Sequence, residues 1–167
     1  GNDYLDKPHL LFWTTLAFFK IFGVTTIAHR LPALLFALVS IYCTYQLTRH
    51  LTNRSTARIA AIILATAQAF VLSIIDARME TPLTTGIILG LWHLILYIDK
   101  GKFIHLLGGA LGVAIAFATK GWLGPGVVFI AVFCHILLNR QWKVLARPAT
   151  WLFFPFFLLF ISPVLYG

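Results

Sequence analysis

A charged segment, Asp3-Tyr4-Leu5-Asp6-Lys7-Pro8-His9, leads directly into the apolar run LLFWTTLAFFKIF of residues 10–22. Proline fixes its own φ and favours an extended residue before it, so Asp6 and Lys7 are expected on a turn in front of a helix. Pro8 suits the first turn of that helix, and Gly23 marks its end. The run contains a lysine and is shorter than the ~20 residues that cross a bilayer. We therefore predict a helix that lies in the membrane interface beside a charged loop.

The composition places the rest of the chain in a membrane. Of the 167 residues, 60% are hydrophobic and only 11% are charged, with a mean hydropathy of +0.89. Soluble domains have about 25% charged residues, so the alternative that residues 10–22 form a buried helix of a soluble domain is disfavoured. The net charge of +8 is spread over short loops and forms no continuous basic face. Membrane lipids, and not nucleic acid, are therefore the expected partners.

Apolar runs separated by short polar loops predict six transmembrane helices. Several are shorter than ~20 residues, which a membrane protein tolerates where flanking side chains snorkel or the bilayer is thin. The expected fold is all-α, a polytopic membrane helix bundle with an external juxtamembrane amphipathic helix. We divide the chain into an external loop with that helix, residues 1–30, and a six-span bundle, residues 31–167. The predicted spans cover about 30–47, 59–75, 83–98, 103–119, 122–138 and 149–166.

The charged residues sort by loop, because alternate loops lie on opposite sides of a membrane. The loops after the first, third and fifth spans hold eight of the 13 Lys and Arg residues, which makes that side cytoplasmic by the positive-inside rule. The opposite, external side holds four of the five acids. Acids contribute little to orientation, so their clustering suggests that the external face is the functional one. The four are Asp3, Asp6, Asp76 and Glu80.

Three charged clusters lie on the predicted external side: Asp6-Lys7, the segment 76–80 with Asp76, Arg78 and Glu80, and Lys120. Ionisable residues near membrane depth cost on the order of 3 kcal/mol each, so they tend to be paired or functional. Lysine and arginine hold phosphate through charge-assisted hydrogen bonds, and carboxylates hold a divalent metal or position a hydroxyl. The clusters together suit a phosphate-bearing lipid.

Each cluster also has a purely structural interpretation. Lys120 can be a lysine at a helix end that snorkels to the surface. The acids and the arginine of segment 76–80 can pair among themselves in a solvated turn. Asp6 and Lys7 can form a surface ion pair that contributes almost nothing to stability.

The remaining polar candidates are weaker. Cys43 and Cys134 lie inside apolar runs with no partner at metal-ligand spacing, so they are read as packing residues. His9 can ligate a metal but is more typical of a polar helix start. The other histidines of interest are read as core or incidental residues: His93, His105 and His135.

A set of motifs in order resembles the polytopic GT-C glycosyltransferases, and within them the ArnT-like and protein-mannosyltransferase-like branch (glycosyltransferase family 39/83 type). Each motif is weak alone, and their joint occurrence over nearly the whole chain carries the resemblance. The motifs are Tyr4-Leu5-Asp6-Lys7-Pro8-His9-Leu10-Leu11-Phe12-Trp13, Phe22-Gly23, Arg30-Leu31-Pro32-Ala33-Leu34, Ala77-Arg78-x-Glu80-x-Pro82-Leu83 and Ala118-Thr119-Lys120-Gly121.

The resemblance implies an enzyme that transfers a sugar from a polyprenyl-phosphate-linked donor to a lipid, glycan or protein acceptor. It implies a multi-pass protein of the bacterial inner (plasma) membrane, with the active face periplasmic or extracellular. By this resemblance Lys7 and Lys120 would hold the donor phosphate, and the enzyme hypothesis adds Arg78 as a third phosphate-binding residue. Glu80 or Asp76 matches a cavity-lining acid, and Asp6 matches a residue linked to a divalent metal, the one cofactor implied.

The sequence departs from the family pattern at two places. The family has Pro-Pro after the lysine, where this chain has Pro8-His9. The family's proposed catalytic base lies upstream of the acid-Lys-Pro motif, so it is expected before Gly1, and Asp3 is too near Lys7 to replace it. We therefore expect a fragment, incomplete at both ends, that is inactive alone and belongs to one GT-C membrane domain. The alternative function is a non-catalytic polytopic transporter or lipid-binding membrane subunit.

Overall fold

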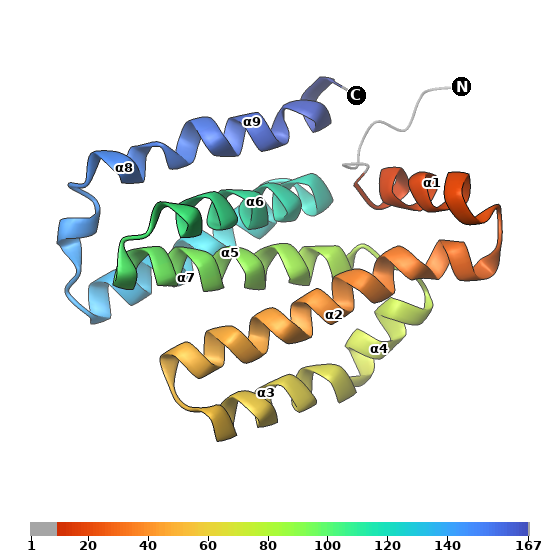
Figure 1. The fold of residues 1–167 in the computed structure, drawn as a ribbon, viewed down its shortest axis with the longest axis horizontal. Helices are drawn as coiled ribbons and strands as arrows, with labels where there is room; N and C mark the ends of the chain where they lie inside the picture. Colours follow the sequence, from red (N-terminus) through yellow and green to blue (C-terminus); the bar gives the residue numbers. More distant parts are fainter. Residues whose placement is uncertain (1–9, 167) are drawn as a thin grey trace.

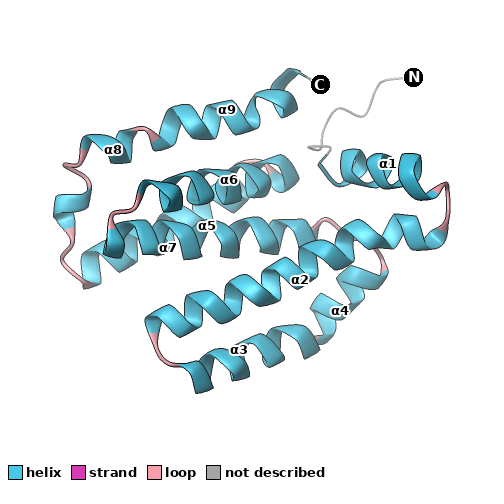
Figure 2. Cartoon of the chain, in the orientation of Figure 1, coloured by secondary structure: helices cyan, strands magenta, loops and turns pink. Residues whose placement is uncertain are grey.

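The fold is built from helices alone over residues 10–166, which are the residues that the computed structural model describes (Figures 1 and 2). Nine α-helices and one short 3-10 helix, η1, follow one another with brief connections in this part of the chain. The predicted all-α membrane bundle is therefore confirmed. The elements are α1 Leu10–Phe22, α2 Thr26–Leu51, α3 Arg54–Thr66, α4 Gln68–Ile75, α5 Glu80–Lys100, α6 Phe103–Lys120, α7 Leu123–Leu138, η1 Trp142–Val144, α8 Pro148–Trp151 and α9 Phe153–Tyr166.

Three of these helices, α2, α5 and α6, are long and apolar enough to cross a membrane. The predicted second span is not one straight helix, because Ala67 leaves the helical conformation and α3 meets α4 at a bend of 52°. Counted as one span, this bent pair gives a fourth. The predicted fifth and sixth spans correspond to α7 and to α8–α9, which are shorter apolar helices.

The first long helix begins earlier than predicted. The sequence predicts a span that starts at about residue 30, but α2 begins at Thr26, because Thr25 caps it by accepting a hydrogen bond from the backbone N–H of Ala28 at 3.1 Å. Pro32 consequently lies inside the helix, near its start. The expected division of the chain after residue 30 falls within this continuous helix.

The helix predicted at residues 10–22 is present as α1, and it ends where Gly23 adopts a positive φ of 75°. Figure 1 shows α1 beside the first turns of α2. Several of its large apolar side chains are exposed, among them Phe12, Leu16 and Ile21. Such a surface suits lipid, and the position of α1 in the membrane interface stays a prediction.

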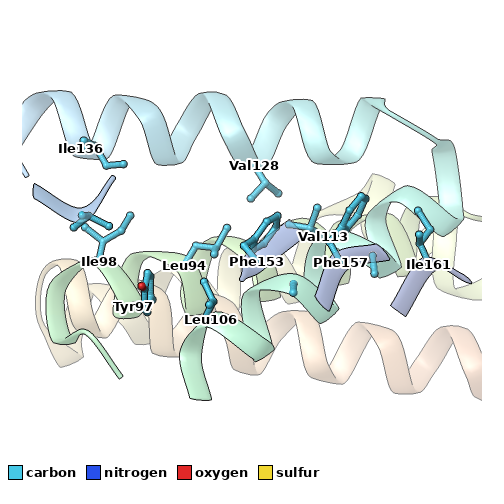
Figure 3. Close-up of a cluster of buried hydrophobic side chains, with 13 residues drawn as sticks. Leu94, Tyr97, Ile98, Leu106, Val113, Val128, Ile136, Phe153, Phe157 and Ile161 are labelled. Atoms are coloured by element: carbon cyan, nitrogen blue, oxygen red, sulfur yellow. The ribbon is translucent and has the colours of Figure 1, made fainter. Parts of the chain in front are cut away.

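The core lies between α5, α6, α7 and α9 (Figure 3). The α5–α6 hairpin turns at Gly101, whose φ of 69° is readily adopted only by a residue without a Cβ. Leu106, Val113 and Val128 are almost completely buried in this core. Aromatic rings of α9, Phe153 and Phe157, close it on the remaining side.

Glycines let α5 and α6 approach at backbone distance. A Cβ on Gly86 of α5 would lie 2.5 Å from the backbone nitrogen of Ala116 in α6, and a Cβ on Gly112 would collide with the backbone of Gly90. Small residues spaced by four permit this contact between membrane helices. Gly108, four residues before Gly112, instead makes room for the ring of His93.

Hydroxyl groups join α2 to the same hairpin. Ser40 and Thr85 share a buried hydrogen bond of 2.7 Å, and the Thr85 hydroxyl also donates to the carbonyl of Phe36 at 2.7 Å. Between α4 and α5, the hydroxyls of Ser73 and Thr81 lie 3.1 Å apart. Hydrogen bonds of this kind hold membrane helices together where no apolar driving force exists between them.

The helix ends form two groups. The α2–α3, α5–α6 and α7–α8 connections gather at one end of the bundle, and the α1–α2, α4–α5 and α6–α7 connections at the other (Figure 1). With 21 residues, α5 is about 31 Å long, close to the ~30 Å of a bilayer core. We call the first group the basic end, since it contains Arg49, Lys100, Lys102 and Lys143. We call the second group the acidic end, because two of the three described acids, Asp76 and Glu80, lie there beside Arg78 and Lys120.

Candidate functional site

The acidic end brings together two residues that are forty positions apart in the sequence. The ammonium Nζ of Lys120, the last residue of α6, donates to Oε1 of Glu80, the first residue of α5, at 2.9 Å. The backbone contact at Gly86 and Ala116 lies within two turns of both residues and fixes this register. The carboxylate thus sits at a helix N-terminus and the ammonium at a helix C-terminus, which the two helix dipoles favour.

This pair stays open to its surroundings. The side chains of Lys120 and Glu80 are 39% and 51% exposed. Ion pairs with that exposure contribute little to stability, so the pair is not needed to hold the two helices together. An ammonium carries three N–H donors, and Lys120 gives one of them to Glu80. The remaining donors can bind an anionic group.

A second ion pair lies in the turn between α4 and α5. The guanidinium of Arg78 donates to Oδ2 of Asp76 from Nε at 3.0 Å and from Nη2 at 2.7 Å. Ala77 between them has a positive φ of 49°, which turns the chain back toward α5. The solvated-turn interpretation therefore holds for this pair, whereas Glu80 of the same segment turns to Lys120 instead.

The structure thus places four predicted site residues at one end, namely Asp76, Arg78, Glu80 and Lys120. The Coulomb interaction of Arg78 extends to Glu80, so the two pairs share one electrostatic environment. The other two predicted residues, Asp6 and Lys7, lie outside the described residues. The catalytic base that the resemblance expects before Gly1 lies outside the sequence.

The carboxylates of this end do not form a metal site by themselves. Within residues 10–166, no three His, Cys, Asp or Glu side chains come close enough to hold a metal ion. Asp76 and Glu80 are each engaged by a cationic side chain. The described residues therefore do not fit a divalent metal, and the assignment of Asp6 as a ligand stays a prediction.

A polar cluster that the sequence interpretation missed lies at the basic end. The carboxylate of Asp99 accepts from Nε2 of His50 at 2.6 Å, and from the Gln141 amide at 3.2 Å. Nε2 of His135 lies 3.3 Å from the same carboxylate. These contacts connect α2, α5, α7 and the segment before η1. The signal in the sequence was that Asp99 is the one acid on the predicted cytoplasmic side.

Replacing Asp99 with alanine is expected to loosen this end of the bundle. His50, His135 and Gln141 would lose their shared acceptor, and hydrogen bonds to a charged group contribute about 1.5–3 kcal/mol each. Because the side chain is 22% exposed and water can replace part of the loss, we expect the free energy of unfolding to fall by about 2 kcal/mol. Denaturant unfolding in detergent, followed by tryptophan fluorescence, measures it.

Asp76→Ala is the matched control for that measurement. It also removes one carboxylate from an ion pair, but its partner Arg78 belongs to the same turn, so no second helix is released. We expect a change within about 0.5 kcal/mol. Equal unfolding midpoints for Asp99→Ala and the wild-type protein would show that the Asp99 cluster does not hold the helices together.

Comparisons with known proteins agree with this architecture. Residues 6–166 match the profile of a family described as "Dolichyl-phosphate-mannose-protein mannosyltransferase". The chain is 28% identical over 140 residues to a protein of Bacillus subtilis (strain 168) named provisionally as the mannosyltransferase YycA, with 84% of this chain and 20% of that protein covered. It is 27% identical over 143 residues to the undecaprenyl phosphate-alpha-4-amino-4-deoxy-L-arabinose arabinosyl transferase 2 of Proteus mirabilis (strain HI4320), with 83% and 26% covered.

A solved structure has the same fold. The crystal structure of ArnT from Cupriavidus metallidurans, bound to undecaprenyl phosphate, superposes with a TM-score of 0.84 at 18% identity. The superposition covers 98% of this chain and 31% of that protein. The chain thus spans less than a third of the length of each of these three proteins.

Proposed function

This chain belongs to the dolichyl-phosphate-mannose-protein mannosyltransferase family, and on that premise we propose that the protein containing it is a membrane glycosyltransferase. It would take a sugar from a polyprenyl-phosphate-linked donor and transfer it to a lipid, glycan or protein acceptor. The observation that carries the proposal is the open Glu80–Lys120 pair at the acidic end of a bundle whose sequence matches this family over residues 6–166.

Lys120 is the central residue of the proposed donor site. A lipid-linked donor keeps its chain in the bilayer and its phosphate at the membrane surface, which is the level at which α5 begins and α6 ends. Lys120 would donate to a phosphate oxygen while it keeps its hydrogen bond to Glu80. Glu80 is therefore proposed to position the lysine.

Arg78 and Lys7 would complete the phosphate site. Arg78 gives Nε and Nη2 to Asp76 and retains Nη1 for a ligand, so Asp76 would position it. Lys7 precedes α1 in sequence, and its part in the site rests on the resemblance. Asp6 is proposed as a metal ligand on the same ground, and no step below depends on a metal.

The chemistry of sugar transfer determines the role that these cations would have. A hydroxyl oxygen of the acceptor forms a bond to the anomeric carbon as the bond from that carbon to the phosphate oxygen breaks. The hydroxyl proton passes to a carboxylate base, which we propose lies upstream of Gly1. Negative charge grows on the departing polyprenyl phosphate, where Lys120, Arg78 and Lys7 would stabilise it.

The distribution of charge supports a site at the membrane surface. Between Glu80 and Asp99, α5 has no charged residue, and between Lys102 and Lys120, α6 has none. Transporters instead place polar groups near the midplane, commonly in broken helices. By the positive-inside rule the basic end faces the cytoplasm, so the acidic end is proposed to lie on the periplasmic or extracellular side of the inner membrane.

The proposal is tested with the full-length protein, purified and reconstituted into liposomes. A polyprenyl-phosphate sugar labelled in the sugar is supplied, and transfer of label to an extracted acceptor fraction is measured. A nucleotide sugar at the same concentration is the control donor and is expected to give no transfer. Movement of the lipid-linked donor across the membrane without transfer to any acceptor would favour the transporter alternative.

A further inference from the structure

We propose that the basic end of the bundle contains a binding site for the head group of a net-anionic phospholipid, separate from the donor site. The site is a pocket of about 390 Å³ between the last turns of α2 and α5. This volume lies within the ~300–1,000 Å³ typical of ligand sites. The lining residues are Gln46, Arg49, His50, Trp92, Leu96 and Lys100.

The lining follows from helix geometry. Trp92, Leu96 and Lys100 recur every four residues and so share one face of α5. Gln46, Arg49 and His50 have the i, i+3, i+4 spacing that places them on one face of α2. The two faces meet at the Asp99–His50 hydrogen bond of 2.6 Å, which fixes the distance between the helices at the pocket.

The pocket is positively charged. Arg49 and Lys100 are exposed, and within residues 10–166 neither forms an ion pair with a carboxylate. Asp99 is the nearest acid in the sequence, but it does not line the pocket, and its oxygens are engaged by His50, His135 and Gln141. These hydrogen bonds leave the negative charge of Asp99 in place beside His50, so Asp99 offsets one of the two cations.

The helix dipoles oppose this charge. Both α2 and α5 end here, and each C-terminus contributes about half a negative charge. With Asp99 the two dipoles match the two cations of the pocket, and the other six Lys and Arg residues of the basic end leave this end of the bundle positive. The pocket therefore favours an anion, and it disfavours head groups in which an ammonium balances the phosphate.

Aromatic side chains indicate that the ligand is a lipid. Trp92 lies two turns inside the end of α5, so the pocket extends from the cationic helix ends to the depth of lipid acyl chains. Its ring packs edge-on against Tyr42 at 5.9 Å, and the Tyr42 hydroxyl accepts from the Gln46 amide at 2.7 Å. The inner part of the pocket thus has an ordered aromatic surface and its outer part has a cation on each helix, which matches an acyl-chain root and a phosphate. Basic pockets between transmembrane helices on the cytoplasmic side bind anionic head groups in this way.

The test measures lipid binding, so its outcome is independent of sugar transfer. The full-length protein in detergent is titrated with phosphatidylglycerol or phosphatidylcholine, and bound lipid is counted by native mass spectrometry. We expect one phosphatidylglycerol to bind more tightly than any phosphatidylcholine. Each cation near a membrane surface contributes about fivefold in affinity, so Arg49→Gln with Lys100→Gln should weaken that binding by about 25-fold.

The matched control is Arg54→Gln with Lys143→Gln. It removes one arginine and one lysine that are exposed at the same end and do not line the pocket, and it should change binding by less than about twofold. Gln46→Glu adds a carboxylate of nearly equal shape to the pocket and should weaken binding without removing a side chain.

Three results would overturn the proposal. The first is that neither the double variant at Arg49 and Lys100 nor Gln46→Glu changes the affinity for phosphatidylglycerol. The second is equal binding of phosphatidylcholine. The third is complete displacement of phosphatidylglycerol by excess inorganic phosphate, which would assign the pocket to a free ion. If the double variant fails to fold, Arg49→Lys with Lys100→Arg keeps both charges and must retain the bound lipid.

Discussion

Lys120→Ala is expected to lower kcat/KM for transfer from the lipid-linked donor by about 10²–10³-fold in the full-length protein, the loss typical when one donor to a developing anion is removed. The ammonium holds its place through a single hydrogen bond to Glu80, and its side chain is open enough to meet a phosphate. Stability should change by less than about 1 kcal/mol, because the ion pair is half exposed. Sugar transfer and unfolding are therefore expected to respond separately.

Lys20→Ala is the control for this variant. Lys20 is another exposed lysine, located on α1, and no described carboxylate lies within ion-pair distance of it. Its removal should leave kcat/KM within about twofold. Glu80→Gln keeps an oxygen that accepts from Lys120, so it should reduce kcat/KM by much less than Lys120→Ala. Transfer at the wild-type rate in Lys120→Ala would remove the lysine from the donor site, while the family assignment would stand.

Gly112→Leu is expected to prevent the α5–α6 hairpin from closing, with a loss of more than about 3 kcal/mol in the free energy of unfolding. Even a Cβ at this position would collide with the backbone of Gly90, and backbone cannot rotate away as a side chain can. The register that joins Glu80 to Lys120 would be lost with the packing. We therefore expect a low yield of monodisperse protein and an early unfolding midpoint.

Gly126→Leu separates this effect from the simple addition of a large side chain. Gly126 lies in α7, and a Cβ there would meet nothing within 4 Å. The control should change the free energy of unfolding by less than about 0.5 kcal/mol. Size-exclusion profiles and detergent unfolding curves of the two variants measure the difference. Similar curves for both would show that α5 and α6 are not held at backbone distance.

Local patterns in the sequence predicted most of the elements. Apolar runs between charged loops located the helices, because burial in lipid requires an uninterrupted apolar segment whatever its neighbours are. The same patterns could not show the break at Ala67, since that residue is a good helix former and no proline or glycine marks the bend. They also misplaced the start of α2, because Pro32 is tolerated inside it and Thr25 provides the cap.

Contacts between distant residues were harder to predict. The chemistry of Lys120 and Glu80 identified both as site candidates, but their pairing depends on the register of a hairpin that glycine packing sets. The Asp99 cluster was missed because His50 and His135 come from different helices and carry no shared spacing. Residue type thus indicated what each side chain could bind, and only the packed helices show which side chains meet.

The glycine contact between α5 and α6 also bears on the order in which the chain can assemble. Gly86 and Gly112 are 26 positions apart, so their contact closes a short loop, and the entropy lost in closing a loop grows only slowly with its length. Both helices also precede α7 and α9 in the chain, so the contact between them needs no later part of the sequence. The Glu80–Lys120 ion pair at the open end of the hairpin would then form early, and α7 and α9 would pack against a hairpin that is already folded.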